Sequence, residues 1–268
     1  MADLIHSEVR ASILHELSQI EDKHDVRILY ACESGSRAWG FESKDSDYDV
    51  RFLYVRPRDW YLSIDVERRR DVIELPIDEE LDINGWDLRK ALQLFRKSNP
   101  PLLEWLNSPI VYLEKGVCAN RMRELSPATF NPIAAHYHYL RMAENNYKAH
   151  LRGQRVRRKK YLYVLRPLLA VLWINQEKGV VPTEFDKLVQ GVVDDVELVR
   201  EIESLLRAKR AGKEVDAGPR YPRIHDFIDN ELTRHRAAPA APEPIQVDNH
   251  RLSELFREIL GTDEMDLL

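Results

Sequence analysis

The fold is decided by one stretch, Glu33–Val55, which reads ESGSRAWGFESKDSDYDVRFLYV. A run of β-forming residues, Val26–Cys32, precedes it, and a second such run, Asp49–Val55, closes it. Both runs are typical of strands. The residues between them, Glu33–Ser46, are polar and include two glycines, which is typical of a turn or loop. The stretch therefore predicts two strands joined by a polar loop.

Two aspartates, Asp47 and Asp49, stand where the second strand begins. Residues two apart on a strand project from the same face, so the two carboxylates are expected side by side. Like charges so close repel each other, and a divalent cation such as Mg²⁺ would relieve the repulsion, because it prefers oxygen ligands. Asp45 is interpreted as a loop residue, since the pair next to the strand already meets this pattern.

A Gly-Ser dipeptide, Gly35-Ser36, follows the first strand. Gly35 permits backbone conformations that other residues avoid, and Ser36 offers a hydroxyl and an amide to an anion. Glycine, serine and aspartate are each common in ordinary turns. Their ordered combination across two strands nevertheless favours a chemical role. An anion-binding turn beside a carboxylate pair predicts a site for a nucleoside triphosphate with Mg²⁺.

The remainder of the chain predicts an α+β protein of two lobes. Residues 1–115 would form a mixed, mostly antiparallel sheet with flanking helices, and residues 116–268 a helical lobe. A linker is expected at Arg236–Pro244, which reads RAAPAAPEP. The other expected elements are a helix over Ile5–Leu17, strands over Asp71–Leu75 and Glu79–Gly85, a helix over Asp87–Ser98, short elements over Leu102–Leu106 and Ile110–Leu113, helices over Pro132–Arg152, Lys159–Lys178, Asp194–Ala211 and Ile224–Arg236, and a short helix near the C-terminal end.

The composition excludes several classes of protein. With 44% hydrophobic and 32% charged residues the chain is globular, and its net charge of −5 excludes a wholly basic nucleic-acid coat protein. Two cysteines exclude a disulfide scaffold and a Cys-rich zinc site. No signal peptide is predicted, and the most apolar stretch, Tyr161–Ile174, is too short for a membrane span. The expected location is cytoplasmic, with no membrane partner.

Gly35-Ser36 followed by Asp47-x-Asp49 resembles the active-site signature of the polymerase-β-like nucleotidyltransferase superfamily. The wider run, together with LDINGWDLRKAL at residues 81–92 and NPPLLEWLNSPIVY at residues 99–112, is similar to the RlaP-like family, described as predicted nucleotidyltransferases of an RNA repair pathway. The resemblance implies a polymerase-β-like sheet domain with a helical C-terminal lobe. It also implies transfer of NMP from an NTP to an acceptor hydroxyl, with release of pyrophosphate and two Mg²⁺ or Mn²⁺ ions.

The superfamily pattern includes a third carboxylate on a later strand, between hydrophobic residues. Asp82, in Leu81-Asp82-Ile83, fits this pattern and would join Asp47 and Asp49 as a metal ligand and catalytic residue. Glu74 is the alternative, and Glu80 could belong to the same acidic edge. If these acidic residues have no catalytic function, they would belong to a solvent-exposed edge strand with alternating charges.

A basic span lies in the helical half, since Asn145–Gln176 contains no Asp or Glu. In a chain of net negative charge this favours a phosphate-binding face, for the triphosphate or for a nucleic-acid backbone. The spacing of Lys159, Tyr163 and Arg166 puts them on one helix face. Arg37, close to Gly35 and Ser36, is a further candidate for the triphosphate. In the helical half the nucleotide-binding candidates are Lys159, Lys160 and Tyr163, and the nucleic-acid-binding candidates are Arg152, Arg155, Arg157 and Arg158.

The family resemblance and the basic span favour an RNA 3′ end as the acceptor. The first alternative is AMP transfer to a partner protein, such as a toxin. The second is a catalytically silent RNA-binding protein, against which the Asp47 and Asp49 pair argues. The sequence leaves the NTP and the choice between Lys159 and Lys160 open.

Overall fold

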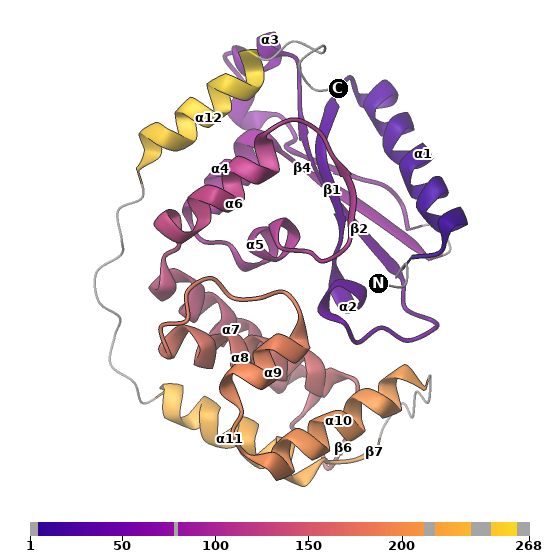
Figure 1. Ribbon diagram of the computed structural model, residues 1–268, viewed down its shortest axis with the longest axis vertical. Coiled ribbons are helices and arrows are strands. Elements are labelled where there is room, and N and C mark those ends of the chain that lie inside the picture. The colour runs from indigo at the N-terminus through magenta and orange to yellow at the C-terminus, as the bar shows by residue number, and fades with distance from the viewer. Residues whose placement is uncertain (1–4, 78–79, 212–217, 237–247, 262–268) are drawn as a thin grey trace.

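A computed structural model describes residues 5–77, 80–211, 218–236 and 248–261 of the chain (Figure 1). A five-stranded sheet with helices on both faces forms one lobe, and a bundle of helices forms the other. The elements are α1 (Ser7–His24), β1 (Arg27–Glu33), α2 (Gly35–Trp39), β2 (Tyr48–Val55), α3 (Arg58–Tyr61), η1 (Val66–Arg68), β3 (Val72–Glu74), β4 (Leu81–Asp87), α4 (Leu88–Arg96), α5 (Pro100–Leu106), β5 (Val111–Glu114), α6 (Cys118–Thr129), α7 (Pro132–His150), β6 (Arg155–Val156), α8 (Lys160–Asn175), α9 (Phe185–Val192), α10 (Val196–Arg210), β7 (Gly218–Pro219), α11 (Pro222–Arg236) and α12 (Asn249–Gly261).

The sheet has the strand order β3-β4-β2-β1-β5. β2 and β4 are parallel neighbours, and the other three pairs are antiparallel. This is the mixed, mostly antiparallel sheet that the sequence predicted. Because β2 lies inside the sheet, its last four residues, Phe52–Val55, are all buried, whereas its first four alternate between buried and half-buried. The alternation marks the end of β2 where the aspartates lie.

The two faces of the sheet have separate cores. Side chains of α1 pack on one face, against Tyr48, Val50 and Phe52 of β2. On the other face α4, α5, α6 and α12 pack against the remaining residues of β2, such as Leu53 and Val55. Asp49 therefore projects from the face that α4, α5, α6 and α12 cover.

The helical lobe is built around α8, in which nearly every residue is buried. A helix that is apolar on all sides belongs inside a core, and α7, α9, α10 and α11 surround this one. Phe41, which follows α2 in the sheet lobe, is buried in the same core. The two lobes therefore share packed side chains where α2 ends.

Most of the expected elements are present, with bounds that move by a few residues. The prediction of a polar loop over Glu33–Ser46 was wrong in part, because Gly35–Trp39 forms the short helix α2. The sequence did not predict α3, α6 or α9. Most of the expected linker lies outside the described residues, at positions 237–244. The division at residues 115 and 116 stays a prediction.

α12, near the C-terminal end, packs on the sheet lobe rather than on the helical lobe. Its Leu252, Leu255 and Ile259 are buried in the core that α4 and α6 share, and Arg27 of β1 donates a hydrogen bond to the Ile259 carbonyl at 3.2 Å. The chain therefore leaves the sheet lobe after α6 and returns to it at α12.

Candidate active site

The parallel pairing of β2 and β4 brings two aspartates together. Asp49 and Asp82 are direct register partners, so their side chains project from the same face of the sheet. Arg51, two residues after Asp49, contacts both: its Nη2 lies 3.0 Å from Asp49 Oδ1 and 2.7 Å from Asp82 Oδ2. Burial raises the pKa of Asp49; Arg51 opposes this shift, while Asp82 and Asp47 add to it.

Glu74, the alternative to Asp82, lies on the edge strand β3 opposite Asn84. Its carboxylate accepts hydrogen bonds from Arg70 at 2.7 Å and from Asn84 at 3.0 Å. The contact with Arg51 thus joins Asp82, and not Glu74, to Asp49. Glu80 is exposed and directly precedes β4, where its carbonyl accepts the Tyr48 amide at 2.7 Å.

Asp47 lies just before β2 and is exposed. Its backbone is fixed by Arg37, which donates to the carbonyls of Asp47 at 3.3 Å and Ser46 at 2.6 Å. The Arg37 guanidinium also lies 3.8 Å from the centre of the Tyr48 ring. Arg37, the candidate for triphosphate contact, is therefore placed where it holds the loop that carries Asp47. We call Asp47, Asp49 and Asp82 the carboxylate cluster.

The turn that opens α2 lies directly against Asp49. Gly35 has φ +58°, and a Cβ atom there would fall 2.0 Å from Asp49 Oδ2. The glycine is therefore needed for space as well as for conformation. Ser36 follows as a buried residue of the same turn, 8% exposed. The structure thus brings Gly35 and Ser36 beside Asp49.

Gly35→Ala is expected to displace the Asp49 carboxylate and to reduce any activity of this site more than tenfold. The matched control is Gly40→Ala: Gly40 also has a positive φ, +84°, but a Cβ there would meet nothing within 4 Å. Both variants carry a backbone penalty of about 1 kcal/mol, and Gly35→Ala adds the cost of moving the Asp49 carboxylate that Arg51 holds, so its melting temperature should fall further than that of Gly40→Ala. Equal activity in the two variants would contradict the role of the Gly35–Asp49 contact.

A buried glutamate supports the cluster from the α1 side of the sheet. Glu33 is fully buried; it accepts hydrogen bonds from the Asp49 amide at 3.0 Å and the Tyr112 hydroxyl at 2.5 Å. Burial raises the pKa of Glu33 to about 7. Its contact with the main chain of Asp49 fixes the strand at the position from which that carboxylate projects.

The donor set fits a magnesium ion that is completed by phosphate. Among the described residues, no three His, Cys, Asp or Glu side chains are grouped closely enough to hold a metal by themselves. Mg²⁺ in phosphate-transfer sites commonly takes only one or two carboxylates and fills its other positions with water and substrate oxygens. Asp49 and Asp82 supply such a pair, and because Gly35 carries no side chain the backbone of its turn lies directly against Asp49.

Lys160 and Tyr163 of α8 lie toward α2. The Lys160 ammonium is 4.6 Å from the centre of the Tyr163 ring, and that ring packs edge-on against Trp39, the last residue of α2, at 6.0 Å. Burial lowers the pKa of Lys160, and Lys159 and Arg157 add to the effect. Lys159, by contrast, is exposed and precedes the helix. These contacts connect Lys160 to the turn beside Asp49.

Arg166 does not belong to the basic face, and that part of the prediction was wrong. The side chain is 2% exposed, and its Nη1 lies 2.6 Å from Oε1 of Glu104, which is buried too. Trp39 donates to the other oxygen of Glu104 at 3.1 Å, and Tyr139 to Oε1 at 3.2 Å. Thr183 donates to the Glu104 carbonyl at 3.1 Å. The arginine is thus part of a buried polar network between the lobes.

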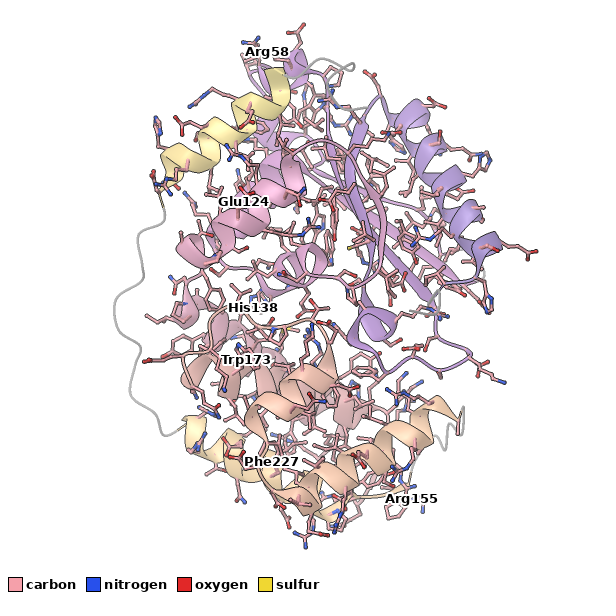
Figure 2. All side chains as sticks on the ribbon, viewed as in Figure 1. Arg58, Glu124, His138, Arg155, Trp173 and Phe227 are labelled. Carbon is pink, nitrogen blue, oxygen red and sulfur yellow. The ribbon has the colours of Figure 1, made fainter. Side chains whose placement is uncertain are left out.

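The four arginines predicted to bind nucleic acid lie on the helical lobe. Arg152, Arg155 and Arg157 are exposed, and Figure 2 shows Arg155 at the opposite end of the molecule from Arg58. Arg158 is half-buried: its Nε donates to the Pro219 carbonyl at 3.2 Å. Three of the four therefore present side chains to solvent.

The chain matches the family model described as "RlaP: RNA repair pathway DNA polymerase beta family" over residues 9–258. The chain belongs to the RlaP family. It is therefore a polymerase-β-like, nucleotidyltransferase-type protein, and the family resemblance seen in the sequence is confirmed. This RlaP-family chain is 50% identical over 256 residues to "Uncharacterized protein YcgL" of Bacillus subtilis (strain 168), covering 96% of the chain and 97% of that protein.

One solved structure similar to this RlaP-family chain is a nucleotidyltransferase-like protein from Exiguobacterium sibiricum 255-15. The two share 12% sequence identity with a TM-score of 0.27, and the match covers 90% of this chain and 86% of the other. In the described part of the RlaP-family chain, no helix is long and apolar enough to cross a membrane.

Sequence reasoning missed three residues of the site. Arg51 could have been found, because the two-residue period that pairs Asp47 with Asp49 also places Arg51 on that face. Glu33 and Glu104 carry no such signal, since each looks like an ordinary surface acid beside a turn or within a helix. Their burial arises from contacts with residues far away in the sequence.

Proposed function

We propose that the protein is a metal-dependent nucleotidyltransferase that moves NMP from an NTP to an RNA 3′ hydroxyl and releases pyrophosphate. The observation that carries the proposal is the register pairing of Asp49 with Asp82, with the Gly35 turn packed against the first of them. Two carboxylates and a turn in contact suit the binding of a phosphate chain with its cation.

The carboxylate cluster would hold two Mg²⁺ or Mn²⁺ ions. When bound, such ions neutralise phosphate charge and lower the pKa of an attacking hydroxyl. Asp82 would accept the proton of the acceptor hydroxyl. Ser36 and the backbone of its turn would hold the leaving pyrophosphate, while Arg37 fixes the loop of Asp47. These residues would act by orienting the reactants for an in-line displacement.

Lys160 is the proposed cation for the triphosphate, because its ammonium lies against the Tyr163 ring, which packs against Trp39 of α2. Lys160→Ala is expected to weaken binding of a non-hydrolysable NTP analogue roughly tenfold, the value of one charge-assisted hydrogen bond. Lys159→Ala is the matched control and should change the affinity less than about twofold. Calorimetric titration measures both. A larger loss in Lys159→Ala would reverse the assignment.

An RNA acceptor is supported by two observations. The family description places its members in an RNA repair pathway, and Arg152, Arg155 and Arg157 are exposed on the helical lobe. Exposed arginines are the usual contacts to a nucleic-acid backbone.

The deciding experiment offers the purified protein each α-labelled NTP with Mg²⁺ and one acceptor at a time: RNA, DNA or protein. Label on the RNA 3′ end supports the proposal. Label on a protein would make the chain a protein nucleotidyltransferase. RNA binding without label on any acceptor would favour a silent RNA-binding protein.

A further inference from the structure

Arg51 lies between Asp49 and Asp82, two members of the carboxylate cluster. Its side chain is 17% exposed. One terminal nitrogen, Nη2, contacts Asp49 Oδ1 at 3.0 Å and Asp82 Oδ2 at 2.7 Å. The other, Nη1, donates to the carbonyls of Asp82 at 2.7 Å and Val50 at 3.0 Å. Both terminal nitrogens are thus fully used, and the guanidinium is anchored to the main chain of β2 and β4 as well as to the carboxylates.

In this arrangement Arg51 balances the negative charge of two neighbouring carboxylates when no metal is bound. Direct strand partners with like charges repel each other. An arginine side chain carries a positive charge, and Arg51 places that charge between the two carboxylates. One oxygen of each carboxylate is taken by Arg51. The Asp49 oxygen that remains, Oδ2, is the one that faces the Gly35 turn.

We propose that Arg51 is a built-in counter-cation that holds Asp49 and Asp82 together in the free protein and makes tight metal binding depend on the nucleotide. The proposal deepens the proposed function and rests on it, because it assumes that the carboxylate cluster is the metal site. Arg51 is a positioning residue in this account, since it acts through the two aspartates.

The dependence on nucleotide follows from counting charges. Asp49 and Asp82 bring two negative charges to the place where Arg51 contacts them, and Arg51 cancels one of the two. The charge that remains is smaller than that of a single divalent ion, which Arg51 also repels at short range. A triphosphate brings further negative charge to the same spot, and only then do two divalent ions find enough opposite charge. The free protein should therefore bind metal weakly.

The test is a titration of the full-length protein with Mn²⁺, followed by electron paramagnetic resonance, with and without a non-hydrolysable NTP analogue. Wild type should bind Mn²⁺ at least about tenfold more tightly when the analogue is present. Arg51→Gln should bind Mn²⁺ roughly tenfold more tightly than wild type without nucleotide, because one nearby positive charge has been removed. Arg51→Lys, which keeps that charge, is the matched control and should resemble wild type.

Two results would overturn the proposal: unchanged or weaker Mn²⁺ affinity in Arg51→Gln without nucleotide, or Arg51→Lys behaving like Arg51→Gln. If Arg51→Gln does not fold, Arg51→Met takes its place, because methionine also removes the positive charge and the same gain in Mn²⁺ affinity without nucleotide is expected. No acceptor or turnover enters these measurements. A protein that binds Mn²⁺ as expected but labels no acceptor would contradict the proposed function alone.

Discussion

Replacing Asp47 or Asp49 of the carboxylate cluster by asparagine is expected to lower nucleotidyl transfer by at least about a thousandfold. The charge stabilisation that a carboxylate-bound divalent ion supplies is worth several kcal/mol, and every 1.4 kcal/mol is a factor of ten in rate. Asparagine keeps the shape of the side chain, so the fold should survive. Asp47 is exposed, and its replacement should leave the melting temperature nearly unchanged.

The matched control is Asp45→Asn. Asp45 is exposed in the same loop, two residues before Asp47, and should be dispensable. Single-turnover transfer of label from an α-labelled NTP measures all three variants on one scale. Activity within tenfold of wild type in both Asp47→Asn and Asp49→Asn would remove the carboxylate cluster from the mechanism.

The largest loss of stability is expected from Arg166→Met. Removing one partner of a buried ion pair leaves the other charge without compensation, which costs about 3–5 kcal/mol. For a chain of this size that corresponds to a fall in melting temperature of roughly 10 °C. Of the described hydrogen bonds to its carboxylate, Glu104 would keep those from Trp39 and Tyr139.

The double variant Glu104→Gln with Arg166→Met tests whether the uncompensated charge is the cause. Because it removes both charges, it should be more stable than Arg166→Met alone. Thermal unfolding of the wild type, Arg166→Met, Glu104→Gln and the double variant gives the comparison. A double variant that loses as much as the two single changes added together would show that the residues contribute independently.

The sequence was sufficient to predict the elements that carry the carboxylates. The strands of Asp49 and Asp82, the glycine turn and the long helices α7, α8, α10 and α11 all have strong local signals, and the structure contains each of them. The short helix α2 was missed because it has only five residues and begins with Gly-Ser, so that no helical periodicity can develop. The catalytic, metal-binding and nucleic-acid roles of the candidate residues stay predictions.

Long-range pairing is the part that the sequence could not supply. The alternation of side chains along β4 does not indicate that this strand lies parallel to β2, or that Asp82 is the register partner of Asp49. Register is decided by contacts across the sheet. Arg166 shows the same limit. Its spacing from Lys159 and Tyr163 suggested a shared face, but a buried acid 62 residues earlier in the chain draws it inward. Its apolar neighbours Leu165 and Leu168 were the signal in the sequence that this part of the helix is buried.

The return of α12 to the sheet lobe means that this lobe is completed by a segment that follows the helical lobe in the sequence. Leu252, Leu255 and Ile259 of α12 are buried in the core that α4 and α6 share, and Arg27 of β1 donates to the Ile259 carbonyl. A fragment that ends after α6 would therefore leave the apolar surface under α12 exposed to water. Such a truncated sheet lobe is expected to be less stable than the same lobe in the whole chain.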